Sequence, residues 1–234
     1  MTIITTFDTS EKIRALSTGT IAALSTEMMA ELTSSQFSWF ATNQIAALST
    51  NSLASLATTV QLAGLTTAQA AVLSAAQLDA LSDSNIISLE TADVRAISSA
   101  AISALSSDKF AAFVSTQIGA LTTKQFVGLN AAYLNSSQVH GLTTAHAISL
   151  TSAQLNNISN AALGELSTRS IEVIRTGAIR AMLSSQLDAF TSAQFIALTT
   201  NQAAALTGAQ AGALWTDILG VMETRDVRAL NTGV

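Results

Sequence analysis

The chain has 234 residues, of which 49% are apolar, 11% are charged and 5% are aromatic. Its net charge of −5 argues against nucleic acid and anionic membrane surfaces as partners, because both require a basic face. The absence of cysteine excludes disulfides and thiolate metal sites. The absence of proline is typical of a chain that needs helical backbone donors throughout. No uninterrupted apolar run is long enough to predict a membrane span.

Residues 1–8 form a short lead-in without the basic and apolar regions of a cleaved signal peptide. From Thr9 onward the sequence repeats every eight residues, and we number the columns of each repeat so that Thr9 stands in column one. The step is broken by one extra residue at Ala57 and by five at 130–134. This gives 15 repeats in 9–129, an irregular insertion, 12 repeats in 135–230 and a tail at 231–234. We expect the two segments to form one continuous domain.

The apolar columns predict the fold. Columns five and eight are apolar in every repeat and, being three positions apart, share one face of a helix. A continuous helix is excluded because an eight-residue step leaves a drift of about 80° per repeat, and the pattern lacks the period of a strand. We therefore predict an all-α solenoid, a superhelix of 27 short capped helices with one per repeat and three to four repeats per turn. Columns five and eight should fill its core, and column six should face solvent.

The position of the helix cap has two solutions. Column two is Ser or Thr in 23 of 27 repeats and column one in 19, so the prediction places the cap at column two. A cap at column one would instead put the column-four Gln, present in 13 repeats, in the capping-box position. With the cap at column two, we expect this Gln to bond a neighbouring turn of the solenoid and form a ladder.

Segments such as Ala-Leu-Thr-Thr-Lys-Gln-Phe (Ala120–Phe126) and Ile-Ala-Ala-Leu-Ser-Thr (Ile45–Thr50) resemble octapeptide arrays in large, poorly characterised bacterial proteins, often described as secreted or surface proteins. The resemblance covers almost the whole chain. It implies a bacterial origin and export without a cleaved signal to the cell surface or beyond it, with a cytoplasmic location as the alternative. It implies no catalytic residue. In architecture, the stacked short helices are similar to the superhelical regulatory domains of magnesium transporters.

Chemical motifs are sparse. His140 and His146 have no Cys, Asp or Glu in the same two repeats, so we predict no metal site and expect each histidine to be exposed or to replace a column-four Gln. The carboxylates are scattered, and the Ser and Thr residues are accounted for as caps. Glycine forms no phosphate-binding pattern. We therefore predict a protein that is not an enzyme and has no cofactor.

Four residues depart from the repeat and are candidates for interaction. Asn130 and Tyr133, the only Tyr, lie in the insertion, which is either an extra helical turn or bulge or a binding loop. Trp39 and Trp215 lie in columns seven and one, where small or polar residues are usual. Each Trp either fills the core or a groove or anchors a partner.

These observations predict a structural or interaction solenoid, such as a bacterial surface, matrix or adhesion module. Its partner would be a protein, a cell surface or a second copy of the chain. The alternative is a module that binds a regular surface, ice or a glycan lattice, through rows of Ser and Thr. Column one distinguishes the two, because hydroxyls aligned outward favour lattice binding and hydroxyls turned into the corners favour the structural role.

Overall fold

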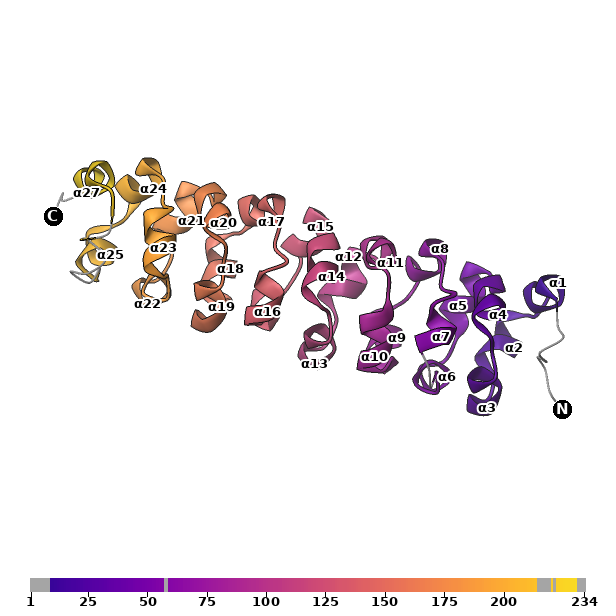
Figure 1. Cartoon of the computed structure of the whole chain (residues 1–234). Coiled ribbons are helices and arrows are strands. Elements are labelled where there is room, and N and C mark those ends of the chain that lie inside the picture. Colours follow the sequence, from indigo (N-terminus) through magenta and orange to yellow (C-terminus); the bar gives the residue numbers. More distant parts are fainter. Residues whose placement is uncertain (1–8, 57–58, 214–219, 221, 231–234) are drawn as a thin grey trace. The chain divides into compact units, whose positions relative to one another are not determined.

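The structure is a computed structural model that describes residues 9–56, 59–213, 220 and 222–230. Within these residues every regular element is a helix and no strand occurs, which confirms the all-α prediction (Figure 1). Contacts divide the described chain into two compact units. The first comprises 9–113 and 120–128, and the second comprises 114–119 and 129–230.

The first unit contains α1 (Ser10–Arg14), α2 (Thr18–Ala22), α3 (Thr26–Ala30), α4 (Ser34–Trp39), α5 (Thr42–Ala47), α6 (Thr50–Ala54), α7 (Thr59–Leu62), α8 (Thr67–Ala70), α9 (Ala75–Ala80), α10 (Asp83–Ser88), α11 (Thr91–Ala96), α12 (Ser99–Ser103), α13 (Ser107–Ala111) and α15 (Thr123–Val127). All but the last residue of α14 (Ser115–Ala120) belongs to the second unit. The second unit continues with the 3-10 helix η1 (Ala131–Tyr133), α16 (Ser136–Val139), α17 (Thr144–Ser149), α18 (Ser152–Asn157), α19 (Asn160–Gly164), α20 (Thr168–Val173), α21 (Thr176–Arg180), α22 (Ser184–Leu187), α23 (Ser192–Ile196), α24 (Thr200–Ala205), α25 (Gly208–Ala213) and α27 (Thr224–Ala229).

Each α-helix occupies one repeat. Helix α4 spans columns two to seven, and the next two residues, Phe40 with ψ 135° and Ala41 with ψ 156°, turn the chain into α5. No described residue has a positive φ, so these corners do not depend on glycine. The prediction of one short helix per repeat is therefore confirmed, with a corner between successive helices.

The core consists of columns five and eight, as predicted. Wherever the exposure of these columns is described, they are buried in all repeats except at Leu16, Ala211 and Val227, which lie close to the chain ends. Phe190 in column eight packs against Phe195 in column five of the next repeat, with ring centroids 5.9 Å apart. This contact brackets the start of α23 in the manner of a hydrophobic staple.

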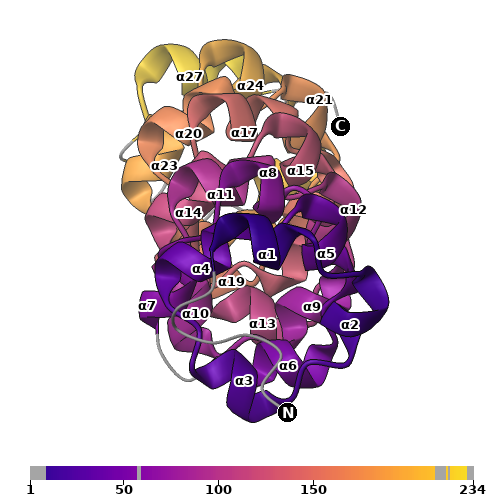
Figure 2. The same ribbon diagram turned by 90° about the vertical axis from the view of Figure 1, so that its right-hand side faces the viewer.

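Successive turns are related by constant offsets. In the first unit α1 packs on α4, α2 on α5 and α3 on α6, and the same offset of three repeats recurs in the second unit, where α17 packs on α20. In the end-on view of Figure 2, the contacting series α1, α4, α7 and α10 shifts step by step around the first unit. A helix therefore does not return to its starting position after three repeats.

The cap prediction is wrong, because the helices begin one column earlier. Column-one side chains accept the cap hydrogen bond: Thr33 Oγ1 accepts from the N–H of Gln36 at 3.2 Å, and Thr66 Oγ1 from that of Gln69 at 3.3 Å. Column two is the first helical residue. Apolar residues are tolerated in column one because the Gln side chain satisfies the same helix start, as when Ala41 donates its N–H to Gln44 Oε1 at 2.8 Å.

The same glutamines also connect turns. Gln44 Nε2 donates to the carbonyls of Ile13 and Leu16, both at 2.8 Å, which are columns five and eight of the repeat four earlier. We call this recurring bridge the glutamine ladder; the same pair of bonds is made by Gln69, Gln77, Gln125, Gln194, Gln202 and Gln210. Helices pack at an offset of three and ladder bonds reach an offset of four, so each unit has between three and four repeats per turn, as predicted.

Replacing Thr66 with Ala is expected to cost about 1 kcal/mol of unfolding free energy, because α8 loses its side-chain cap. Replacing Thr67 with Ala removes a hydroxyl from the first helical position and should cost less. Urea denaturation of the two variants measures the difference. Equal losses would contradict a cap at column one.

Candidate functional site

The insertion at 130–134 is a shortened repeat. Asn130 Oδ1 accepts the N–H of Ala132 at 3.2 Å and caps η1. Ala131 and Leu134, each 2% exposed, are three positions apart and take the places of columns five and eight. Asn130 is exposed and Tyr133 is half-buried. The segment is thus an extra helical turn, and binding by Asn130 or Tyr133 stays a prediction.

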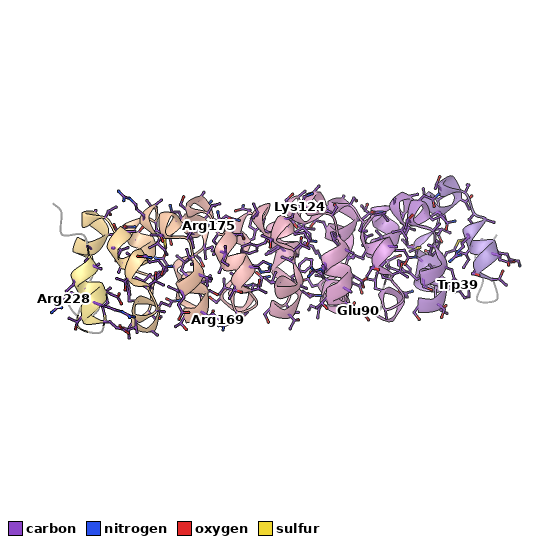
Figure 3. All side chains as sticks on the ribbon, turned by 90° about the horizontal axis from the view of Figure 1, so that it is seen from above. Trp39, Glu90, Lys124, Arg169, Arg175 and Arg228 are labelled. Atoms are coloured by element: carbon purple, nitrogen blue, oxygen red, sulfur yellow. The ribbon has the colours of Figure 1, made fainter. Side chains whose placement is uncertain are left out.

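Of the two tryptophans, only Trp39 lies within the described residues. Trp39 is the last residue of α4 and is half-buried, and its carbonyl accepts from Arg14 Nε at 3.2 Å. Figure 3 labels its side chain in the first unit. Trp215 lies outside the described residues.

The two histidines take the two roles expected of them. His146 is 2% exposed and occupies the column-four position of a capping box, in which its Nδ1 accepts the N–H of Thr143 at 3.3 Å. His140 is exposed, and its Nε2 lies 3.0 Å from Oε2 of Glu165, the C-cap residue of α19, three repeats further on. Among the described residues, no group of three or more His, Cys, Asp or Glu side chains could hold a metal ion.

The glutamine ladder is interrupted in each unit. Between Gln77 and Gln117, four consecutive repeats (82–113) carry other residues in column four, and we call this segment the first interruption. Its column-four residues are Asn85, Asp93, Ala101 and Lys109. The second interruption (159–182) lies between Gln154 and Gln186 and has Ala162, Ser170 and Ala178 in column four.

Charged residues gather at these interruptions. Residues 32–78 contain no Asp, Glu, Lys or Arg, and neither do residues 125–164. Charge resumes next to the interruptions, at Asp79, Asp83, Glu90, Asp93, Arg95, Asp108 and Lys109 in the first case and at Glu165, Arg169, Glu172, Arg175, Arg180 and Asp188 in the second. Figure 3 labels Glu90 in the first unit and Arg169 and Arg175 in the second. Both patterns can be read from the sequence, although their coincidence was not predicted.

Charged groups replace part of the missing ladder in the first interruption. Lys109 Nζ donates to the carbonyl of Leu81, four repeats earlier, and forms an ion pair with Asp83 at 2.9 Å. Asp79 Oδ1 accepts from the hydroxyl of Ser106 at 2.8 Å. These bonds join α13 to the preceding turn. Because Lys109 is largely buried, its ammonium acts as a structural donor and is little available to a ligand.

The second interruption is bridged by Asn156, which belongs to the adjoining repeat. Its Oδ1 accepts the N–H of Leu183 at 2.9 Å, and its Nδ2 donates to the carbonyl of Ala181 at 3.2 Å. The N–H of Leu183 is the group that Gln186 Oε1 would accept in a capping box. That buried oxygen has no hydrogen-bond partner among the described residues, so Asn156 has taken its place.

Ala101 has a side chain too short to reach the preceding turn. It lines an open hollow of about 380 Å³ on the first unit. Its walls are small or apolar and come from two layers of the first unit: Ala71, Val72, Leu73, Ser74, Ala75, Ser98, Ala100 and Ala101. Leu73 supplies a column-eight carbonyl four repeats before Ala101, in the place where other repeats receive a ladder bond.

Replacing Ala101 with Gln is expected to raise the free energy of unfolding by about 1 kcal/mol, because the amide restores a rung of the ladder. Replacing Ala101 with Glu supplies nearly the same shape without the donor and should give no gain at neutral pH. Urea denaturation of both variants tests this. A gain from Glu equal to that from Gln would show that filling the hollow, and not the hydrogen bond, is responsible.

None of the described helices is long and apolar enough to cross a membrane. The geometry defines the class of protein as an all-helical octapeptide-repeat solenoid. A family model for the ALTTAQ repeat matches residues 86–123, which lie mostly in the first interruption. This match confirms the resemblance to octapeptide-repeat arrays. No curated protein and no solved structure matches the chain.

Proposed function

We propose that the chain is a non-enzymatic structural or interaction module of a bacterial surface or extracellular matrix. The observation that carries this proposal is that the recurring polar side chains form hydrogen bonds within the scaffold. Column-one hydroxyls cap helices, and column-four amides join successive turns. Because the side chains of these two columns stabilise the fold, a partner would bind other exposed residues and the interruptions, where the repeat is irregular and charged residues are concentrated.

The first interruption combines exposed charges with an exposed apolar side chain. Glu90, Arg95 and Asp108 are exposed there, and Ile87 is 53% exposed on the same segment. Charges of both signs beside an exposed apolar side chain suit a protein or cell-surface partner, or a second copy of the chain. The uncharged stretch 32–78 would then act as a spacer.

Two measurements on source cells test this proposal. Antibodies against the chain should label intact cells as well as permeabilised ones, and labelling only after permeabilisation would contradict a surface location. Fluorescent purified chain should bind the cells, and the triple variant Glu90→Gln, Arg95→Gln, Asp108→Asn should bind several-fold less. Glu27→Gln with Glu31→Gln is the matched control, because both residues are exposed charges outside the interruptions. An equal loss of cell binding in both variants would show that the first interruption is not the binding surface.

A threonine row favours a second candidate, binding to a regular lattice or glycan. Column-one hydroxyls point to helix starts, which by the criterion above favours the structural role. Column two, however, is not the cap, and its threonines are exposed at the first positions of α2, α5, α8 and α11, which pack on one another in that order. The row consists of Thr18, Thr42, Thr67 and Thr91.

Ice-growth inhibition and glycan-array binding test the second candidate. Val substitutions at Thr42, Thr67 and Thr91 should abolish either activity, whereas Val at Thr26 and Thr50, exposed column-two residues outside the row, should leave it intact. A parent chain inactive in both assays would eliminate lattice binding.

A further inference from the structure

Asp93 is a carboxylic acid in column four, where most repeats carry a hydrogen-bond donor. Its side chain is in column four of α11, and the residue is 4% exposed. One repeat earlier, Asn85 Nδ2 donates to the carbonyl of Leu56 at 3.0 Å, four repeats back. Asn and Asp have the same shape. Leu65 is the equivalent column-eight residue four repeats before Asp93, but a carboxylate has no proton to donate to its carbonyl.

Among the described residues, the only charged group found to act on this carboxyl group is the acidic Glu90. Helix α8, which packs on α11, and helix α7 of the repeat containing Leu65 both lie in the uncharged stretch 32–78. Helix α12 has no charged residue, and α10 adds only the acidic Asp83. On the chain around α11, Glu90 and Arg95 are exposed, as is Lys124 of α15, whose neighbour Gln125 bonds to α11. The ionised form of Asp93 is therefore buried without an adjacent cation.

Burial raises the pKa of Asp93 above its ordinary value, and the negative charge of Glu90 raises it further, while a hydrogen bond from the backbone of Glu90 lowers it. The protonated carboxyl group can do what the Asn85 amide does, since its O–H can donate to a carbonyl.

We propose that Asp93 is a proton-dependent rung of the glutamine ladder. In its protonated form the carboxyl O–H donates to the carbonyl of Leu65 and joins α11 to the preceding turn. In its ionised form the carboxylate faces that carbonyl without a donor, and the contact between the two layers weakens. Acid therefore strengthens the contact between α11 and the preceding turn.

The sign of the pH dependence follows from linkage. A carboxyl group with a raised folded-state pKa favours folding most where it is protonated in both states, below about pH 4. Stability is lost as the pH rises from there through the folded-state pKa. Glu27 acts in the opposite sense, because a backbone hydrogen bond lowers its pKa. The contribution of Asp93 to the pH dependence of stability is therefore measured as the difference between the parent and Asp93→Asn.

Urea denaturation of the whole chain at pH 4 and pH 7.5 tests the proposal. Asp93→Asn should unfold near the parent midpoint at pH 4 and at a clearly higher urea concentration at pH 7.5, because Asn keeps its donor at both pH values. Asn85→Asp is the reciprocal control and should acquire a midpoint that falls more steeply with pH than that of the parent. Amide exchange in α8 and α11 should slow severalfold in Asp93→Asn at pH 7.5.

Two results would overturn the proton-dependent rung. One is a parent and an Asp93→Asn variant whose midpoints change in parallel with pH, and the other is an Asp93→Asn variant less stable than the parent at pH 7.5. Repeating the pH 7.5 measurement with millimolar Ca²⁺ adds a third arm. Stabilisation of the parent, absent in Asp93→Asn, would assign the position to a cation instead of a proton.

Discussion

Replacing Gln202 with Ala is expected to lower the free energy of unfolding by about 2–4 kcal/mol, because the loss of one buried side chain leaves several buried polar groups without a partner. Gln202 Oε1 accepts the N–H of Thr199 at 2.8 Å, and its Nε2 donates to the carbonyls of Ile171 at 2.8 Å and Ile174 at 2.7 Å. The residue is 1% exposed, so water cannot readily replace these bonds.

Two matched variants separate the ladder from helix propensity and shape. Asn201→Ala changes an exposed residue of the same helix and should alter stability by less than about 0.5 kcal/mol. Gln202→Glu keeps the acceptor for Thr199 but loses the donor, so it should be destabilised at neutral pH and should recover part of the loss in acid. Urea denaturation at two pH values measures all three variants. A loss in Gln202→Ala no larger than in Asn201→Ala would show that the ladder is not a source of stability.

The helical fold could be predicted from the sequence because the apolar residues that become buried recur every eight residues. Leu78 and Leu81, three positions apart, occupy columns five and eight and are both fully buried. A step of eight residues cannot keep such a pair on one side of a continuous helix, so the chain must turn once per repeat. This reasoning needs only local geometry and apolar character, and no knowledge of which repeats meet.

The helix cap was predicted in the wrong column because the column-four Gln side chain takes part both in the capping box and in the glutamine ladder. Column one has fewer Ser and Thr residues than column two because it also holds residues such as Ala41 and Val114, which cannot accept a cap hydrogen bond. Gln44 and Gln117 instead accept the N–H groups of these residues at 2.8 and 3.0 Å. The capping box and the ladder were treated as alternatives, whereas the carboxamide has an acceptor for one and a donor for the other.

The interruptions could not be interpreted from sequence alone because their partners are distant along the chain. Lys109 meets Asp83 across 26 residues, and His140 meets Glu165 across 25. The two repeats that contain His140 and His146 have no Asp or Glu, but the solenoid brings together residues three and four repeats apart. Only the value of this offset shows that Asp93 stands where other repeats place a donor.

Deleting Ala41–Leu48, one complete repeat, is expected to leave a folded first unit. The neighbours of each helix are set by offsets of three and four repeats. After removal of one whole repeat, helices on either side of the deletion therefore meet the equivalent columns of a different repeat at the same offsets. An integral number of turns is not required, because a turn contains between three and four repeats. The stability of a solenoid is a sum over such neighbour contacts, and the loss should be limited to one repeat's share.

Deleting Ala47–Thr50 removes half as many residues and should be far more damaging. This deletion removes the corner between α5 and α6 and the Ser49 cap, and it brings Ile45 within four residues of Leu53. The two helices would then run on as one, which misdirects the next corner and exposes apolar residues of columns five and eight. Urea denaturation and limited proteolysis should show a cooperative, protease-resistant protein for the eight-residue deletion and early cleavage within the first unit for the four-residue deletion. If the two deletions behaved alike, the octapeptide would not be the structural unit of this solenoid.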